Sequence, residues 1–473
     1  MPEALDALRE ALDQAVRYRS TAAGRPCMPE RDYHEMRREF SEPLPETGAD
    51  GKDVIRQLAE KGDPGLMQMV HPRFFGWVLG GSHPAGVAAD WLASAWGQNT
   101  GYHTPTPTTA AVEEVAAGWL LELLDLPREA SVGFATGASI GNFVALAAAR
   151  NRVLRAHGWN ANADGLFGAP EIHVFIGDDA HTSVFSALQY LGLGHGRVVR
   201  IDTDCDGRMQ PGHLSREVAT RAGPMIVVAQ AGQINTGAFD PFEDLVDIAR
   251  GARAWLHVDG AFGLWARASV KLRSLTTGIE NADSWVTDGH KWLQTPFDTG
   301  YAIVRDRDAH QRAMTTWASY LPTQQDDERS PSFLVPELSR RARGLATWAM
   351  LKTLGRRGVS DMVERHCQIA QRMAAKLSSE AGVRILNDVV LNQVIVEFGP
   401  ADASTERRKA LTQAVIDAAL ESGDLFVGGA RWRDLWVMRV SVISSETTIE
   451  DGDAATETIL AAWKRVRESA LGP

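Results

Sequence analysis

The feature that most constrains the fold is an alternation of short apolar runs with helical patterns between residues 110 and 310. Several of the runs are apolar at every position, as strands covered on both faces must be. Helical stretches such as 142–155 and 242–251 lie between them. This βαβ rhythm predicts an α/β fold with a mainly parallel sheet and helices on both sides. Seven strands are expected: Val132–Ala135, Ile172–Ile176, Val198–Ile201, Met225–Ala229, Trp255–Val258, Ser284–Thr287 and Gly300–Val304.

The segments on either side of this region predict smaller parts. Residues 1–70 read as charged helical segments that cannot bury much by themselves. Polar residues over 318–338 predict a mobile loop, and a long helical region follows it. Strand patterns return at Gln393–Phe398 and Trp436–Val442. We therefore expect an N-terminal helical arm at 1–70, a large α/β domain at 71–335 and a small C-terminal α+β domain at 336–473.

Charge and cysteine content exclude some classes of protein. The formal net charge of −11 argues against a general nucleic-acid or anionic-membrane binder. Three cysteines, far apart in the chain, suggest neither a disulfide framework nor a metal site. We see no signal peptide and no apolar run near the roughly 18 residues that a membrane helix needs. A cytoplasmic protein without metal is therefore expected.

Ligands of such sheets bind beyond the carboxyl ends of the strands. Four segments at these positions contain residues that could bind a phosphate or take part in a reaction. The turn after the first strand consists of small residues, which would let a phosphate approach the first N–H groups of the next helix. A tight turn without any ligand would have the same sequence pattern. His181, after the second strand, can stack on an aromatic ring or act as an acid or base, although a lone loop histidine is often structural. The residues of the turn are Thr136, Gly137, Ala138 and Ser139.

The other two segments hold a carboxylate and an amine. Asp259 ends an apolar strand and needs a partner there, either a neighbouring N–H or arginine or a pyridinium N–H. Lys291 lies beside His290 and Trp292. Desolvation would free its amine for an imine, whereas a lysine that reaches solvent would stay charged.

Taken together, a phosphate turn, a stacking histidine, an acidic strand end and a lysine 32 residues further on form one pyridoxal 5'-phosphate (PLP) site. The sequence resembles the fold-type-I, group II PLP-dependent amino acid decarboxylases, which include the aromatic-L-amino-acid, histidine and glutamate decarboxylases. The likeness covers nearly the whole chain. The matching segments are His71–Phe75, Phe134–Ser139, Asp179–Ser183, Leu256–Ala261 and His290–Trp292.

The resemblance implies a role for each matching residue. Lys291 would form the imine, and Asp259 would pair with the pyridine nitrogen. His181 would stack on the ring, and Ala261 would lie against it. The 136–139 turn and His290 would bind the phosphate. Phe75 and Trp77 would line the substrate pocket. The family is dimeric, so the resemblance also implies a homodimer.

Departures from the family bear on substrate and outcome, and two of them concern the lysine motif and the catalytic loop. Members often read Asn-Pro-His-Lys where this chain reads Asp288-Gly289-His290-Lys291. The catalytic loop tyrosine of the aromatic decarboxylases has no counterpart near Ser330, and the nearest tyrosine upstream is Tyr320.

The leading interpretation is α-decarboxylation of an L-amino acid, with the aromatic residues near 71–102 favouring an aromatic or bulky substrate. Alternatives that keep the cofactor are decarboxylation coupled to oxidative deamination, a C–C lyase and an aminotransferase. A non-enzymatic PLP-binding regulator is disfavoured, because the sequence shows no DNA-binding extension or basic patch.

Overall fold

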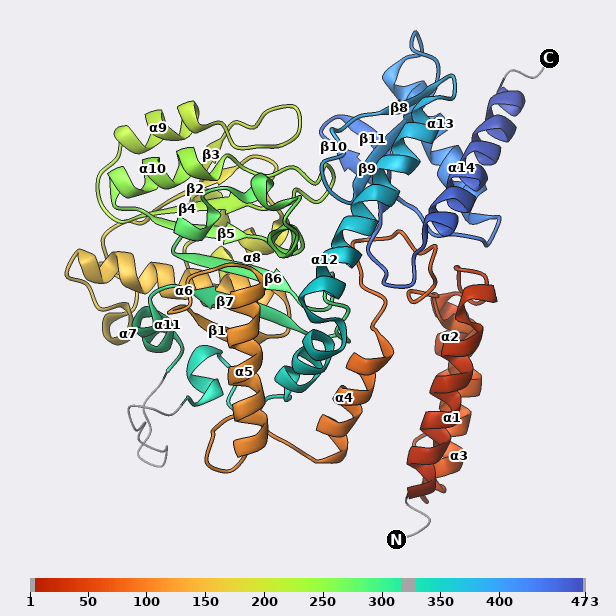
Figure 1. Ribbon diagram of the computed structural model, residues 1–473, viewed down its shortest axis with the longest axis horizontal. Helices are drawn as coiled ribbons and strands as arrows, with labels where there is room; N and C mark the ends of the chain where they lie inside the picture. The colour runs from red at the N-terminus through yellow and green to blue at the C-terminus, as the bar shows by residue number, and fades with distance from the viewer. Residues whose placement is uncertain (1–4, 316–328, 471–473) are drawn as a thin grey trace. The chain divides into compact units, whose positions relative to one another are not determined.

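The computed structural model describes residues 5–315 and 329–470 of the chain. Its contacts divide the chain into two compact units (Figure 1). The larger unit holds Val78–Gln371 and Leu386–Val394, and the smaller holds Met1–Trp77, Arg372–Ile385 and Ile395–Pro473. The three-part division at residues 70 and 335 stays a prediction, since grouping by contacts is a different criterion from a domain boundary.

A seven-stranded sheet forms the centre of the larger unit, in the order β1-β7-β6-β5-β4-β2-β3. β7 is antiparallel to both of its neighbours, and the other pairs are parallel. The predicted fold class and all seven predicted strands are confirmed. The strands are β1 (Ser131–Ala135), β2 (His173–Gly177), β3 (Val199–Ile201), β4 (Met225–Gln230), β5 (Trp255–Asp259), β6 (Ser284–Asp288) and β7 (Gly300–Val304).

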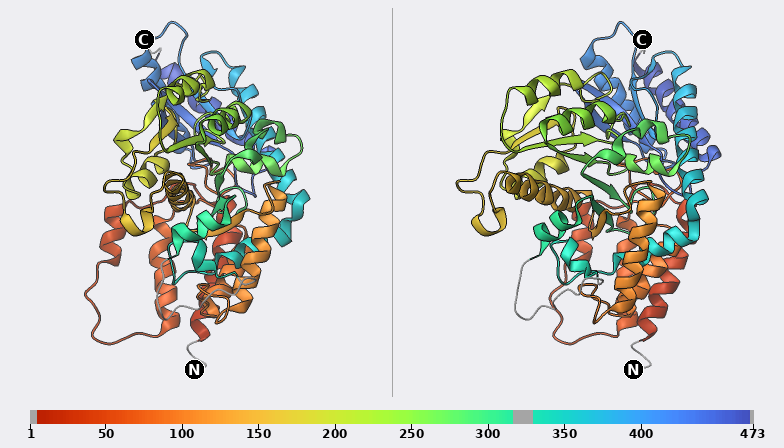
Figure 2. Two further views of the ribbon diagram at one scale, coloured as in Figure 1. Left: turned by 90° about the vertical axis from the view of Figure 1, so that its left-hand side faces the viewer. Right: turned by 60° about the vertical axis from the view of Figure 1, so that its left-hand side comes forward.

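Helices cover this sheet because its strands are apolar on both faces. β1, β4, β5, β6 and β7 are buried along their whole length. α6 (Ala138–Ala156) packs along β7, β6 and β5, while α10 (Phe242–Ala252) packs on β4 and β5 (Figures 1 and 2). A Cβ atom at Gly141 would lie 2.8 Å from Val286, so glycine there lets α6 approach β6 closely.

The other helices of the larger unit are mostly short. α12 contains a non-helical residue, Gly355, at φ 61°, which interrupts the long helical region that the sequence predicted. Its last seven residues belong to the smaller unit. These helices are α4 (Pro84–Ala95), α5 (Pro107–Leu123), α7 (Ala161–Asp164), α8 (Thr182–Tyr190), α9 (Pro211–Ala219), α11 (Arg307–Met314) and α12 (Arg343–Ser378).

The smaller unit combines the arm with an antiparallel sheet in the order β10-β11-β9-β8. Its predicted strands at 393–398 and 436–442 are present, but two further strands were not predicted: one is only three residues long, and the other begins with two glycines. The elements are α1 (Asp6–Thr21), α2 (Tyr33–Phe40), α3 (Gly51–Gly62), β8 (Val383–Ile385), β9 (Gln393–Phe398), α13 (Thr405–Leu420), β10 (Gly428–Trp432), β11 (Leu435–Ser441) and α14 (Ile449–Ala470).

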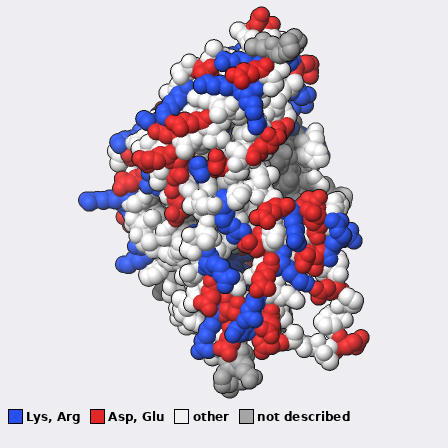
Figure 3. All heavy atoms as spheres, turned by 90° about the vertical axis from the view of Figure 1, so that its right-hand side faces the viewer, with Lys and Arg blue, Asp and Glu red and all other residues white. Residues whose placement is uncertain are grey.

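The arm is amphipathic and strongly charged. Arg56 of α3 pairs with Glu10 of α1 at 3.1 Å. Figure 3 shows a face of the molecule on which basic and acidic side chains are interspersed. Among the residues that the structure describes, no helix combines the length and apolar character needed to cross a membrane.

The predicted loop at 318–338 needs a correction at its C-terminal end. Its first part, with Tyr320, lies outside the described residues. Pro331–Leu334 form a buried 3-10 turn, η8, rather than a polar loop. The backbone N–H of Ser332 donates to the carbonyl of Gly101, and Phe333 packs edge-on against Tyr102. The loop prediction extended too far because the residues before Pro331 are polar, although Pro331–Leu334 are buried.

Candidate active site

The predicted reactive segments all follow strands that end at the same edge of the large sheet. β1, β2, β5 and β6 run in one direction, since β7 is antiparallel to both β1 and β6. The 136–139 turn, His181, Asp259 and Lys291 therefore come to the carboxyl edge, where ligands bind in open α/β sheets.

Lys291 and Asp288 form an ion pair just beyond β6. Nζ of Lys291 lies 3.1 Å from Oδ2 of Asp288, and both side chains are largely buried. The indole N–H of Trp265 donates to the Asp288 carbonyl at 3.0 Å and holds the end of the strand. The amine is thus fixed at the sheet edge rather than extended into solvent, which answers the alternative that the sequence left open.

A glycine segment passes directly over the backbone of this lysine. The N–H of Gly80 donates to the His290 carbonyl at 3.1 Å, and the N–H of Gly81 donates to Oε1 of Gln294 at 2.7 Å. A Cβ at Gly80 would lie 2.3 Å from the Lys291 carbonyl oxygen. Only glycine fits there. The glycine-rich segment near residue 80 therefore packs directly against the backbone of Lys291.

His290 is largely buried and lies beside the same carboxylate. Its ring lies 4.6 Å from that of Phe297, and its Nδ1 accepts from the N–H of Thr299 at 3.3 Å. Burial lowers the pKa of His290, so the neutral ring carries its proton on Nε2, 3.6 Å from Asp288. This N–H is a suitable donor to an anionic group at the edge.

Asp259 is a buried carboxylate whose described partners are all neutral. It is 4% exposed at the end of β5. Oδ1 accepts from the N–H of Ala261 at 3.2 Å, and Oδ2 accepts from the amide of Asn142 at 3.2 Å. Among residues 5–315 and 329–470, no lysine, arginine or histidine forms an ion pair with it. A buried charge without a counter-charge is costly, so the site fits a ligand that brings a cationic N–H.

The small turn before α6 is already engaged by the lysine's neighbour. The N–H of Ala138 donates to Oδ1 of Asp288 at 2.6 Å. A Cβ at Gly300 would lie 2.5 Å from Cα of Gly137, so these two glycines bring the turn against β7. The turn is therefore placed where a phosphate would meet the helix N-terminus, with Asp288 as its present acceptor.

The chain's similarity to known proteins decides between the chemistries that such a site allows. Residues 34–398 match the family described as "Pyridoxal-dependent decarboxylase conserved domain". The chain belongs to this family. It is thus a PLP-dependent amino acid decarboxylase, as the sequence motifs predicted.

Relatives of this decarboxylase carry names that describe different reactions. It is 27% identical over 450 residues to the aromatic-L-amino-acid decarboxylase of Bacillus atrophaeus, covering 93% of this chain and 92% of the relative. It is 26% identical over 452 residues to the phenylacetaldehyde synthase of Arabidopsis thaliana, covering 90% and 88%. The crystal structure of Oryza sativa TDC with PLP and tryptamine has the same fold, with a TM-score of 0.91 at 22% identity over 98% of both chains.

The predicted substrate-pocket residues belong to the smaller unit of the decarboxylase. Phe75 is fully buried, and its N–H donates to the Phe426 carbonyl at 2.9 Å. Trp77 is 46% exposed, and its ring packs against those of Phe74 and Phe426. Their role toward a substrate stays a prediction.

Two buried residues of the site were missed as site residues. Asp288 was noted only as a departure from Asn-Pro-His-Lys, yet it contacts both Ala138 and Lys291. Asn142 was taken as the start of a helix, yet its amide donates to Asp259. A polar residue at a fully buried helix position is a usable signal, but it appears only once the buried face of the helix is known.

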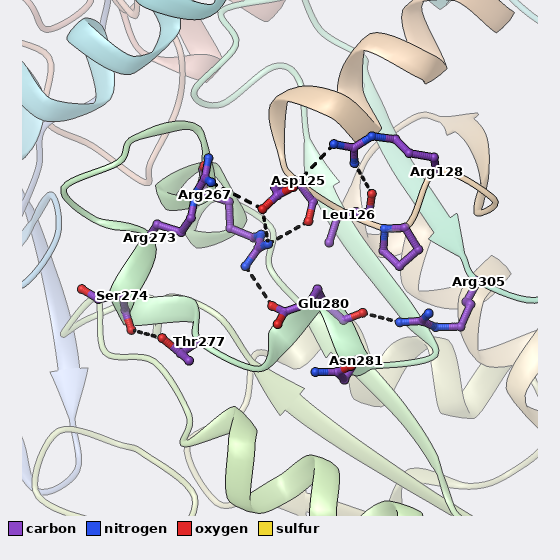
Figure 4. A pocket seen from close by; sticks show the side chains of 11 residues that line it. Asp125, Leu126, Arg128, Arg267, Arg273, Ser274, Thr277, Glu280, Asn281 and Arg305 are labelled. Carbon is purple, nitrogen blue, oxygen red and sulfur yellow. Dashed lines mark hydrogen bonds and ion pairs between the residues drawn. The ribbon is translucent and has the colours of Figure 1, made fainter.

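A surface pocket lies at the opposite edge of the sheet, where β5 and β6 begin (Figure 4). Arg267 is its central residue, with Asp125 at 3.3 Å and Glu280 at 3.2 Å. Its guanidinium also donates to the carbonyls of Leu124 and Asp125. These contacts stabilise the fold, and we assign the pocket no role in catalysis.

Proposed function

We propose that this enzyme removes the α-carboxylate of an L-amino acid with an aromatic or otherwise bulky side chain, with the cofactor bonded covalently to Nζ of Lys291. The observation that carries the proposal is the placement of an amine held at the sheet edge together with a buried carboxylate that lacks a counter-charge. PLP, when bound, supplies an electron-accepting ring that favours loss of CO₂.

The protein's own residues would hold that ring from several sides. Asp259 would accept the pyridine N–H, which keeps the nitrogen protonated. His181 would pack on the ring face opposite Ala261. Oδ2 of Asp288, 3.1 Å from Nζ, is within reach to take the proton that the ammonium must lose before it can act as a nucleophile.

The phosphate would lie over the first turn of α6. The backbone at Thr136, Gly137, Ala138 and Ser139 and the Nε2–H of His290 would be its donors. Phe75 and Trp77 would line the substrate side pocket, which motivates the preference for aromatic or bulky amino acids.

Aldehyde formation is the second candidate, favoured by the similarity to a phenylacetaldehyde synthase. In that reaction the amino acid, O₂ and water would give the aldehyde, CO₂, ammonia and hydrogen peroxide. Assays of amine, aldehyde and peroxide from one reaction mixture under air would separate the two outcomes.

We also propose that the enzyme is a homodimer and acts in the cytoplasm. α1 buries none of its residues, and Leu8, Leu12 and Val16 on one of its faces are 61%, 49% and 59% exposed. A second copy is the partner we propose for this face. Light scattering should give twice the monomer mass, and a chain that begins at His71 should be monomeric or insoluble. An active wild-type monomer would contradict the dimer.

The attachment site has a direct test. Borohydride reduction of the yellow holoenzyme, followed by digestion and mass spectrometry, should place the reduced cofactor on Lys291. The other two lysines of the larger unit, Lys271 and Lys352, serve as internal controls. Recovery of the label on another lysine would refute the assignment.

A further inference from the structure

Behind Asp259, a line of buried polar side chains runs into the core of the larger unit. Trp255, His257 and Asp259 alternate along β5, so their side chains point to the same face of the sheet. Helix α6 covers β5 and contributes Asn142. Ser284, the first residue of β6, is the remaining member. Each of the five is less than 10% exposed.

The distances connect these residues into one hydrogen-bonded chain. Nε1 of Trp255 lies 2.8 Å from Oγ of Ser284, which lies 2.9 Å from Nδ1 of His257. Nε2 of His257 lies 2.8 Å from Oδ1 of Asn142. The Asn142 amide nitrogen then donates to Oδ2 of Asp259.

The carboxylate end fixes the direction of the bonds. Asp259 can only accept, so the Asn142 amide turns its nitrogen toward Asp259 and its Oδ1 toward His257. Burial lowers the pKa of His257 to about 3, so the ring is neutral, and its single proton is on Nε2 because Oδ1 of Asn142 can only accept. Nδ1 then accepts the hydroxyl hydrogen of Ser284, whose Oγ accepts from the indole N–H of Trp255.

The second hydrogen of the same amide serves another site residue. Nδ2 of Asn142 also donates to Oγ of Ser183 at 3.3 Å. Ser183 Oγ lies 2.8 Å from Nδ1 of His181, and the Ser183 N–H donates to the same nitrogen at 3.2 Å. One amide is thus bonded both to Asp259 and, through Ser183, to His181.

We propose that Asn142 is a positioning residue that fixes Asp259 and His181 relative to each other, and that His257 fixes the orientation of its amide. This inference rests on the proposed function, in which Asp259 and His181 contact the cofactor ring. A flipped amide would place oxygen against the Asp259 carboxylate and two donors against each other at His257. Both ends would then lose their hydrogen bonds, so the orientation is held from both sides.

Asn142→Asp tests the donor, because it keeps the size of the side chain and the acceptor for His257. It puts an oxygen where the Asn142 nitrogen faces Asp259. We expect the dissociation constant for PLP to rise at least about tenfold, equivalent to about 1.4 kcal/mol. The visible circular dichroism of the bound cofactor should also change, since the ring would lose its fixed orientation.

Two substitutions at His257 separate positioning from packing. A glutamine amide reaches the position of Nε2 and can still donate to Asn142, whereas an asparagine amide reaches the position of Nδ1 and cannot. His257→Gln should keep PLP affinity within about threefold, and His257→Asn should lose about tenfold. Equal PLP affinity in the two variants would contradict an orienting role.

His310 provides the matched control. It is also fully buried, with Ser131 Oγ 2.8 Å from Nδ1 and the Leu334 carbonyl 2.9 Å from Nε2. These bonds do not lead to Asp259. His310→Gln and His310→Asn should lower the melting temperature without changing PLP affinity or the cofactor spectrum. A matching PLP loss in these controls would reduce the effect at His257 to general destabilisation and overturn the inference.

Nitrogen-15 NMR of the wild-type apoprotein tests the proton position without any substitution. The His257 signals should report a neutral ring with the proton on Nε2, unchanged between pH 5.5 and 8. A proton on Nδ1 would reverse the chain and refute the inference. Borohydride labelling distinguishes the two levels: a label away from Lys291 would overturn the proposed function itself. A label on Lys291, with PLP affinity lost in Asp259→Asn but kept in Asn142→Asp, would overturn only the role of Asn142.

Discussion

The buried charges at the two edges of the large sheet differ in whether they have partners of opposite charge. At the edge where β5 and β6 begin, the guanidinium of Arg267 meets two carboxylates and two backbone carbonyls (Figure 4). At the edge where the same strands end, Asp259 has only neutral donors among the described residues, and one carboxylate, Asp288, is shared by Lys291 and the Ala138 N–H.

This difference in how the buried charges are paired indicates which edge of the sheet is the active site. A saturated charge has no interaction left to offer a ligand, so Arg267 can contribute only to stability. An unsaturated buried charge is costly to keep, and it is offset when a ligand supplies the missing partner. A surface pocket lies at the saturated edge, so here the charge balance, and not the presence of a pocket, indicates the active site.

The largest difference between the edges should appear when the amine is removed. Lys291→Ala should lower kcat by about 10⁴-fold or more, as removal of a covalent catalytic group does in other enzymes. The variant should stay folded, because a side chain that ends in one ion pair contributes little packing. Steady-state kinetics and circular dichroism measure the two quantities. Substantial turnover in a folded variant would move the reaction away from this edge.

Asp259 should show the next largest effect. Asp259→Asn removes the charge but not the volume, and a lost charge-assisted hydrogen bond costs roughly 1.5–3 kcal/mol. The dissociation constant for PLP should therefore rise about 10- to 100-fold, with a larger loss of turnover. Asp259→Glu keeps the charge and should do less harm. Wild-type PLP affinity in the asparagine variant would mean that the carboxylate is only structural.

At the opposite edge the expected effect is on stability alone. Burial lowers the pKa of Arg267, but its partners keep it charged in the neutral range. Arg267→Met should reduce the free energy of unfolding by about 1.5–3 kcal/mol, the value of hydrogen bonds to a charged group. Turnover per folded molecule should change less than twofold. Denaturant titration and active-site counting check this, and a loss of PLP affinity would show that the two edges are coupled.

The sequence predicted the sheet well because its signal is local. Strands such as β4 and β7 consist almost entirely of apolar residues, a pattern typical of strands that are covered on both faces. The same rule placed Asp259 and Lys291 at one edge, since Asp259 ends one buried strand and Lys291 lies three residues beyond the end of another. Short strands with polar or glycine residues, such as β10, lack that signal and form because their neighbours pair with them.

The parts of the site that the sequence did not predict depend on contacts between distant segments. Asn142 and His257 are 115 residues apart, and nothing in either segment indicates their hydrogen bond. Asp288 lies in the lysine motif itself, but its contact with Ala138 joins segments 150 residues apart. Such pairs follow from the register of the strands and the packing of α6, which the sequence pattern leaves undetermined.

Asp288 should give the smallest effect on PLP affinity, and the direction of that effect tests the comparison of the edges. Asp288→Asn keeps an oxygen for the Ala138 N–H but removes a negative charge from the turn where we propose that the phosphate binds. Two unit charges at 4 Å interact by about 1 kcal/mol in water, so PLP should bind about two- to fivefold tighter. The gain should shrink as salt rises, because screening already weakens the repulsion in the wild type. Equilibrium dialysis at two ionic strengths measures both effects. If affinity instead fell more than tenfold, the ion pair between Asp288 and Lys291 would outweigh the repulsion, and Asp288 would be part of the binding machinery rather than an acceptor that the phosphate displaces.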